Sequence, residues 1–271
     1  MVEHTTSSEP LVVKLGGQAL ESAEAARALA QEIASLAAER SVLVVHGGGQ
    51  DVSDWSRRLG LTPQFHEGLR VTDEASLQVA TAVLAGLRNK ELVALLREAG
   101  VDAIGLSACD GELAVLEPHP ESATLGRVGR VVGIRAELLR GFLEIGLVPV
   151  LASVGAQGGH LWNVNADELA GAVARAMQAT NLIFLSDTPG VVIAGEVVRE
   201  IDPEEVPALL AHPDVGGGMI PKLRAAADAV CQSGDMGCIT RWAGEGSLRR
   251  AMAGSEGTCI VTREHTGVAH D

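Results

Sequence analysis

The chain has 271 residues, of which 46% are hydrophobic, 21% charged and only 2% aromatic, so Ala, Val and Leu must fill the core of one large α/β domain or two lobes. The formal net charge of −14 argues against nucleic acid or an anionic membrane as a partner, although a site that concentrates positive groups could still take a small anionic substrate. No apolar run reaches the roughly 18 residues of a membrane span, and the first residues lack the pattern of a signal peptide, so a cytoplasmic protein is expected.

Strands and helices are predicted to alternate, because short apolar runs alternate with longer stretches of helical periodicity. In chain order the expected elements are strand 11–15, helix 21–40, strand 42–45, helix 51–59, helix 74–98, strand 103–106, strand 148–153, helix 167–178, strand 182–185, helix 221–232, helix 247–253 and strand 258–262. The β-like stretches 112–116 and 128–134 interrupt this order as a hairpin-rich insertion. The alternation predicts an α/β fold with a mainly parallel sheet, whose ligands bind beyond the carboxyl ends of the strands.

Glycines gather at these strand ends, most densely in VVHGGGQDVSDW, which covers residues 44–55. A P-loop is absent, and the GxGxxG pattern fails because Val52 occupies its third glycine position. Two interpretations therefore remain open for Gly47 to Gly49. They form either a plain tight turn or a backbone cradle in which amide N–H groups at a helix start receive an anion.

Four charged residues occupy positions where chemistry is possible, and each also has an ordinary explanation. Lys14 interrupts an apolar strand, where it either pairs with an anion or extends its amine to solvent. Lys222 opens a helical run and could be a solvated helix residue, while Asp167 could simply cap the helix that follows NVNA. Arg70 is either a surface arginine or a bidentate clamp for a carboxylate.

The order of these motifs resembles the amino acid kinase family, and within it the short bacterial form of the branch that phosphorylates N-acetylglutamate. The resemblance rests on VVKLGGQAL, VVHGGGQDV, EGLRVTDE, AGLRNKEL, WNVNADELAGAVA, LIFLSDTPGV and GGMIPKLRAAADAV, and it extends from about residue 11 to 261. It implies a three-layer αβα sandwich of the carbamate kinase-like type. It also implies an N-terminal lobe, 1–178, that binds the acetylated amino acid and forms the dimer, and a C-terminal lobe, 179–271, that binds ATP.

The resemblance also implies a role for each matching residue. Lys14 and Lys222 would neutralise charge on the transferring phosphoryl group, and Asp167 would orient both lysines. The substrate-binding residues would be Gly17, Gly48, Gly49, Arg70 and Asn163. The nucleotide-binding residues would be Asp187, Thr188, Gly190, Val191, Val192, Asp214, Val215 and Gly216.

The implied partners are N-acetyl-L-glutamate and ATP with its Mg²⁺, without a protein metal site. The acceptor is already a carboxylate nucleophile, so no general base is needed, and we expect His46 to be a structural, hydrogen-bonded residue. Arginine-inhibited hexameric relatives carry an extra N-terminal helix that we do not find in the sequence, so a homodimer insensitive to arginine is expected. The four cysteines form no CxxC pair and are expected to be reduced structural thiols.

Two other functions remain to be weighed. A related enzyme phosphorylates aminoadipate attached to an acidic carrier protein, but that reaction needs a basic docking surface, and this chain is acidic. A non-catalytic amino-acid or nucleotide sensor on the same fold is disfavoured because Lys14, Asp167 and Lys222 are all present.

Overall fold

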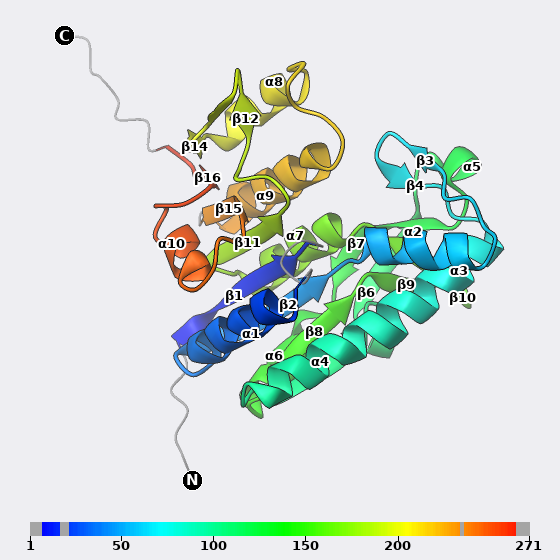
Figure 1. The fold of residues 1–271 in the computed structure, drawn as a ribbon, viewed down its shortest axis with the longest axis horizontal. Coiled ribbons are helices and arrows are strands. Elements are labelled where there is room, and N and C mark those ends of the chain that lie inside the picture. Colours follow the sequence, from blue (N-terminus) through cyan, green and yellow to red (C-terminus); the bar gives the residue numbers. More distant parts are fainter. Residues whose placement is uncertain (1–6, 17–21, 234–235, 264–271) are drawn as a thin grey trace.

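A computed structural model describes residues 7–16, 22–233 and 236–263, so the predicted site residue Gly17 lies outside the described residues. The core is one twisted sheet (Figure 1). Its strand order is β14 (Glu200–Ile201), β16 (Thr258–Ile260), β15 (Met236–Arg241), β11 (Asn181–Ser186), β1 (Ser7–Leu15), β2 (Arg40–His46), β8 (Val148–Ala152) and β5 (Ala103–Ser107). Among the described strands of this sheet all neighbours are parallel except β15 and β16. The predicted mainly parallel sheet is confirmed.

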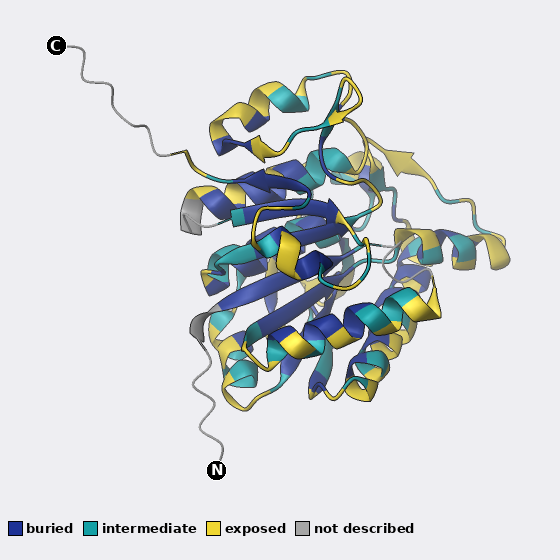
Figure 2. Ribbon diagram, turned by 60° about the vertical axis from the view of Figure 1, so that its left-hand side comes forward, coloured by how far each residue is buried: buried dark blue, intermediate teal, exposed yellow. Residues whose placement is uncertain are grey.

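Helices cover both faces of this sheet and make the fold a three-layer αβα sandwich. One layer comprises α6 (Ala136–Glu144), α7 (Ala166–Met177) and α9 (Met219–Ser233), and the other comprises α1 (Ala23–Ala37), α4 (Asn89–Glu98) and α10 (Ser247–Met252). Alternate residues of β1 serve the two layers, because Val12 packs in the first core and Leu11 and Val13 pack in the second. The strands of this sheet are accordingly mostly buried, while the helices expose their outer faces (Figure 2). No helix in the described part of the chain is both long and apolar enough to cross a membrane.

A second sheet begins just past the carboxyl end of β8, because β9 follows β8 almost directly in the chain. It has the order β6 (Ala114–Pro118), β7 (Val128–Ile134), β10 (His160–Val164) and β9 (Val154–Gln157). The predicted hairpin is present as the antiparallel pair β6–β7, joined through the short helix α5 (Ser122–Leu125), although its first strand begins two residues later than expected. Two small hairpins, β3 (Phe65–His66) with β4 (Leu69–Arg70) and β12 (Val192–Ile193) with β13 (Glu196–Val197), project from the loops.

Several elements of the described core escape the sequence analysis, including β14, β15 and α6. Strand β15 is central, yet its sequence, MGCITR, contains a glycine and polar residues that dilute the apolar signal. Helix α6 is amphipathic, but it is short and follows the predicted insertion directly, and the sequence analysis assigns no element to it. The third predicted helix also differs, since 74–98 consists of α3 (Glu74–Thr81), a π-helical segment (Ala82–Arg88) and α4 in continuous succession. The remaining helices are α2 (Gly49–Arg58) and α8 (Val206–Leu210).

Helices α7 and α9 pack closely against each other at a glycine. A Cβ atom at Gly171 would lie 3.0 Å from the carbonyl oxygen and 3.0 Å from the Cβ of Ala225. Because α7 carries Asp167 and α9 carries Lys222, this contact sets the separation of two predicted catalytic residues.

Replacing Gly171 by Ala should lower the free energy of unfolding. Alanine gains about 1 kcal/mol of helix propensity, but overpacking against backbone atoms costs about 1–3 kcal/mol. Gly141→Ala in α6 is the control, because its Cβ would meet nothing within 4 Å and only the propensity gain applies. Urea unfolding should therefore show opposite signs for the two variants, and a stabilised Gly171→Ala would contradict the close packing.

Candidate functional site

Three of the predicted residues form one buried charge cluster. The Lys14 Nζ lies 2.8 Å from Asp167 Oδ1, and the Lys222 Nζ lies 3.1 Å from Asp167 Oδ2. The side chains of Lys14, Asp167 and Lys222 are only 9%, 8% and 12% exposed. Lys222 also donates to the carbonyl oxygen of Gly218 at 2.9 Å. Two ammonium groups therefore share one carboxylate, and the cluster keeps one positive charge in excess.

Asp167 is available to the lysines because another residue caps its helix. The Asn165 side chain accepts from the backbone N–H groups of Asp167 and Glu168 at 2.8 and 3.1 Å, so the capping role considered for Asp167 belongs to Asn165. Burial disfavours the charged form of Asp167, but the lysines outweigh it and hold the pKa of the carboxyl below its ordinary value. Asp167 is thus an ionised carboxylate that pairs with both lysines.

The three glycines after β2 lie at the start of α2, and the free space beside each of them differs. A Cβ at Gly47 would lie 3.3 Å from the Cβ of Ala166, directly before Asp167, and one at Gly48 would lie 2.9 Å from the Leu84 Cδ2. At Gly49 it would meet no atom of the described residues within 4 Å. Within the described part of the chain no hydrogen bond engages the amide N–H of Gly48 or Gly49. These N–H groups at a helix start are suited to receive an anion.

Arg70 and Asn163 belong to the same hydrogen-bonded neighbourhood. Arg70 donates to the carbonyl oxygen of Gly49 and to the Ser53 hydroxyl, both at 2.7 Å. The Thr72 hydroxyl donates to the Arg70 carbonyl oxygen and accepts from the Asn163 amide at 3.1 Å. Burial, and then the charge of Arg57, lowers the pKa of Arg70. The structure thus brings Gly49, Arg70 and Asn163 into one neighbourhood, with Ser53 and Thr72 as connectors that the sequence did not single out.

The residues predicted to bind nucleotide lie on loops around β12 and before α9. Asp187 and Thr188 are exposed just past β11, which neighbours β1. The N–H of Val191 donates to the hydroxyl of buried Thr258 at 2.8 Å, and a Cβ at Gly190 would clash with that hydroxyl at 2.5 Å. Asp214 accepts from the N–H of Ala194 at 2.8 Å and so joins the two loops. Val192, Val215 and Gly216 lie on the same joined loops.

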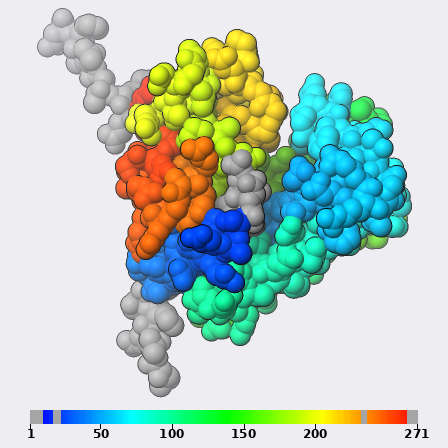
Figure 3. Space-filling model, viewed as in Figure 1, coloured from blue at the N-terminus to red at the C-terminus, as the bar shows by residue number. Residues whose placement is uncertain are grey.

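A hollow separates the two groups of loops. The space-filling view shows it between the cyan region around α2 and β3–β4 and the yellow region that includes α8 (Figure 3). At the tip of the β3–β4 hairpin, a Cβ on Gly68 would lie 3.5 Å from the carbonyl oxygen of Gly217. The acceptor-side loops and the nucleotide-side loops therefore approach each other at the glycines before α9.

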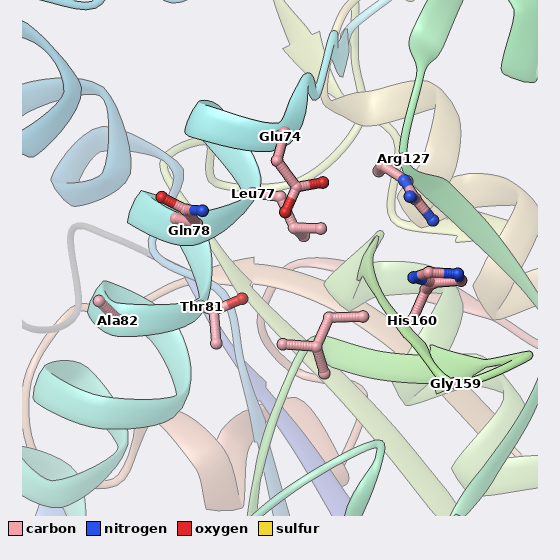
Figure 4. A pocket seen from close by; sticks show the side chains of 9 residues that line it. Glu74, Leu77, Gln78, Thr81, Ala82, Arg127, Gly159 and His160 are labelled. Carbon is pink, nitrogen blue, oxygen red and sulfur yellow. The ribbon is translucent and has the colours of Figure 1, made fainter.

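A separate cavity of about 370 Å³ contains none of these residues. It opens between α3 and the β9–β10 hairpin, with Glu74 and Gln78 facing Arg127 and His160 (Figure 4). Its lining comprises Glu74, Leu77, Gln78, Thr81, Ala82, Arg127, Gly159, His160 and Leu161. The candidate site is therefore the lysine cluster with the glycines before α2 and the loops before α9, and not this cavity. Among the described residues no three His, Cys, Asp or Glu side chains are grouped as a metal site would require.

His46 lies beneath the glycines and is structural, as the sequence suggested. Its ring is only 1% exposed, and its two nitrogens lie 3.0 Å from the Gly47 carbonyl oxygen and 3.1 Å from the Asn89 amide nitrogen. Burial, reinforced by the charges of Lys14 and Lys90, lowers the pKa of His46 to about 4. The imidazole is therefore neutral at pH 7.

Comparison with known proteins places this geometry in a family. The model of the amino acid kinase family matches residues 9–240. An acetylglutamate kinase from Methanopyrus kandleri is 46% identical over 229 residues, which span 81% of this chain and 89% of the relative. One from Roseiflexus sp. is 38% identical over 260 residues, 96% of either chain. A carbamate kinase from Giardia lamblia shares the fold with a TM-score of 0.72 at 16% identity, covering 94% of this chain and 99% of the other.

The neutral state of His46 predicts a pH-dependent stability. Between pH 6.5 and about 4 the unfolded imidazole binds a proton that the folded one does not, so stability is fully present above pH 6.5 and falls as the pH drops to about 4. The full difference corresponds to about 3 kcal/mol. Denaturant unfolding of wild type and His46→Asn across this range should show a steeper loss in wild type, and parallel curves would contradict the assignment.

Proposed function

Because the chain belongs to the amino acid kinase family, we propose that it transfers the γ-phosphoryl group of ATP to the side-chain carboxylate of N-acetyl-L-glutamate. On this proposal the chain acts as its relatives named acetylglutamate kinase do, and the reaction is an early step of arginine biosynthesis. A carboxylate oxygen attacks the γ-phosphorus, the bond to the oxygen bridging the β and γ phosphates breaks, and ADP leaves. The product is the acyl phosphate, N-acetyl-L-glutamyl 5-phosphate.

The observation that carries the proposal is the pair of lysines on one buried carboxylate. Two anions, ATP and the acceptor, must meet in this reaction, and the transition state spreads negative charge over the phosphoryl oxygens. Lys14 and Lys222 supply fixed positive charge there, and Asp167 holds both amines in place without neutralising both. The acceptor carboxylate is already deprotonated at neutral pH, so the reaction needs no general base and leaves no proton for His46 to accept.

The acceptor binds on the side of β2 and α2. The N–H groups of Gly48 and Gly49, together with Gly17, which follows β1 in the sequence, receive the reacting carboxylate. Arg70 pairs with the substrate's α-carboxylate, and Asn163 binds its acetylamino group. The hydrogen bonds from Arg70 to Gly49 and from Thr72 to the Arg70 carbonyl support these roles, because they fix the guanidinium beside the glycine N–H groups.

ATP binds on the other side of the hollow and brings Mg²⁺ with it as part of the substrate. The loops that contain Asp187 to Val192 and Asp214 to Gly216 hold the nucleotide. A division into lobes 1–178 and 179–271 is supported by the position of residues 178 and 179 between α7 and β11. We also place the enzyme in the cytoplasm as a homodimer. The relatives are acetylglutamate kinases, which favours the free acetylated amino acid over a carrier-bound aminoadipate.

Lys222→Ala should lower kcat for acetylglutamate phosphorylation by about 100- to 1,000-fold, because the lysine acts on charge that develops in the transition state. Arg224→Ala is the matched control, since Arg224 is exposed two residues further along α9. A coupled assay of ADP release measures both variants with acetylglutamate, glutamate and aminoadipate as acceptors. Full activity of Lys222→Ala, or a wild type that turns over only aminoadipate compounds, would overturn the proposal.

Gly49→Ala should separate the two substrates. The new Cβ meets no atom of the described residues within 4 Å, so we expect folding to be preserved, but it stands where the acceptor carboxylate meets the Gly49 N–H. We expect kcat/KM for acetylglutamate to fall by about 10-fold or more, with ATP binding measured by calorimetry unchanged. An unchanged kcat/KM for acetylglutamate would show that the acceptor binds elsewhere.

A further inference from the structure

Asn89, a residue without a role in the proposed reaction, is the centre of a buried polar network beneath the glycine loop. It is 0% exposed and begins α4 directly after the π-helical segment. Its amide nitrogen lies 3.1 Å from His46 Nε2, 3.2 Å from the Leu106 carbonyl oxygen and 2.9 Å from the Val150 carbonyl oxygen. Two N–H bonds are thus shared among three acceptors on the neighbouring strands β2, β5 and β8.

The partners of Asn89 fix which way its amide points. Lys90 Nζ lies 3.0 Å from the Asn89 Oδ1 and also donates to the Gly105 carbonyl oxygen at 3.1 Å. An ammonium group only donates, so the atom that faces Lys90 must be the amide oxygen. The NH₂ group then faces His46, and the two carbonyl oxygens beside it are acceptors as well. No other orientation of the amide satisfies all four neighbours.

This orientation determines the tautomer of His46 and the direction of a peptide bond in the glycine loop. Because Asn89 donates to Nε2, the proton of the neutral ring must reside on Nδ1, from which it is donated to the Gly47 carbonyl oxygen. The carbonyl of Gly47 and the N–H of Gly48 point in opposite directions across their trans peptide bond. The Gly48 N–H is therefore directed away from the buried ring.

We propose that Asn89 and His46 are positioning residues for phosphoryl transfer: Asn89 selects the Nδ1–H tautomer of His46, which orients the Gly47–Gly48 peptide so that its N–H faces the acceptor carboxylate. The same helical stretch holds the loop at two further points. Arg88 pairs with Asp51 in the first turn of α2, and the Leu84 side chain closes the space above Gly48. This inference rests on the proposed function, because it assigns the Gly48 N–H to the acceptor.

Two substitutions of His46 separate the roles of its nitrogens. His46→Asn places an amide N–H near the Nδ1 position and can still donate to the Gly47 carbonyl oxygen. His46→Gln places its amide near the Nε2 position, where it meets Asn89 but leaves Gly47 without a donor. Both variants introduce a buried amide. Leu36→Ala serves as a destabilised control, because Leu36 lies in α1 and packs in the core on the other face of the sheet from α7 and α9.

We expect His46→Gln to lose about 10- to 100-fold in kcat/KM for acetylglutamate while its KM for ATP stays at the wild-type value. His46→Asn and Leu36→Ala should retain kcat/KM for acetylglutamate per folded enzyme. Equal losses in the two His46 variants, or no loss in either, would overturn the proposal.

A second measurement needs no activity. In ¹⁵N-histidine NMR spectra at neutral pH, the signal that disappears in His46→Asn should belong to an Nδ1–H tautomer, and Asn89→Ala should convert it to a mixture. An Nε2–H tautomer in wild type would overturn the inference, even if the protein proves to be an acetylglutamate kinase. A wild type that fails to phosphorylate acetylglutamate but shows the Nδ1–H ring would instead refute the proposed function alone.

Discussion

The arrangement depends on one buried carboxylate placed between two lysines. Three charges removed from water are costly, and a lone buried ammonium would be more so. Asp167 makes the pair tolerable, yet one positive charge remains uncompensated inside a protein whose formal net charge is −14. An anionic ligand would neutralise that local excess, so the cluster suits a site that receives negative charge. The acidic chain as a whole repels anions at long range, and the lysine pair attracts them only close to the site.

The same cluster connects distant parts of the chain. Lys14 comes from the central strand β1, Asp167 from the first turn of α7, and Lys222 from α9. Each stands near one end of an element that packs apolar residues into the core, so the layers of the sandwich fix these ends in space. The small residues at the α7–α9 contact let the two helices approach closely. Lys222 of α9 can therefore reach Asp167 of α7, which also contacts Lys14 of β1.

The sequence predicted the parts of this site that break a strong local pattern. Lys14 interrupts an apolar strand, and the glycines and Lys222 punctuate strand–helix junctions, so each was visible without coordinates. The role of Asp167 was ambiguous until Asn165 was found to cap the helix, because residues two apart at a helix start can both be caps. Asn89 gave no such signal: a polar residue within a helix is usually solvated, and its burial arises only because β2, β5 and β8 converge on it. Strand β15 was missed for a related reason, since its place in the middle of the sheet comes from its neighbours and not from its own sequence.

The π-helical segment at Ala82–Arg88 makes the length of this helix functionally important. A π turn holds about one residue more than an α turn, and such insertions often occur at functional sites. Each added or removed residue rotates everything downstream by roughly 100° about the helix axis. Shortening the segment by one residue would give a more regular helix and leave both of its ends amphipathic. It would, however, rotate either Asn89 away from its partners on β2, β5 and β8 or α3 away from its contacts. Along this stretch, homologous chains should therefore vary in residue type more readily than in residue number.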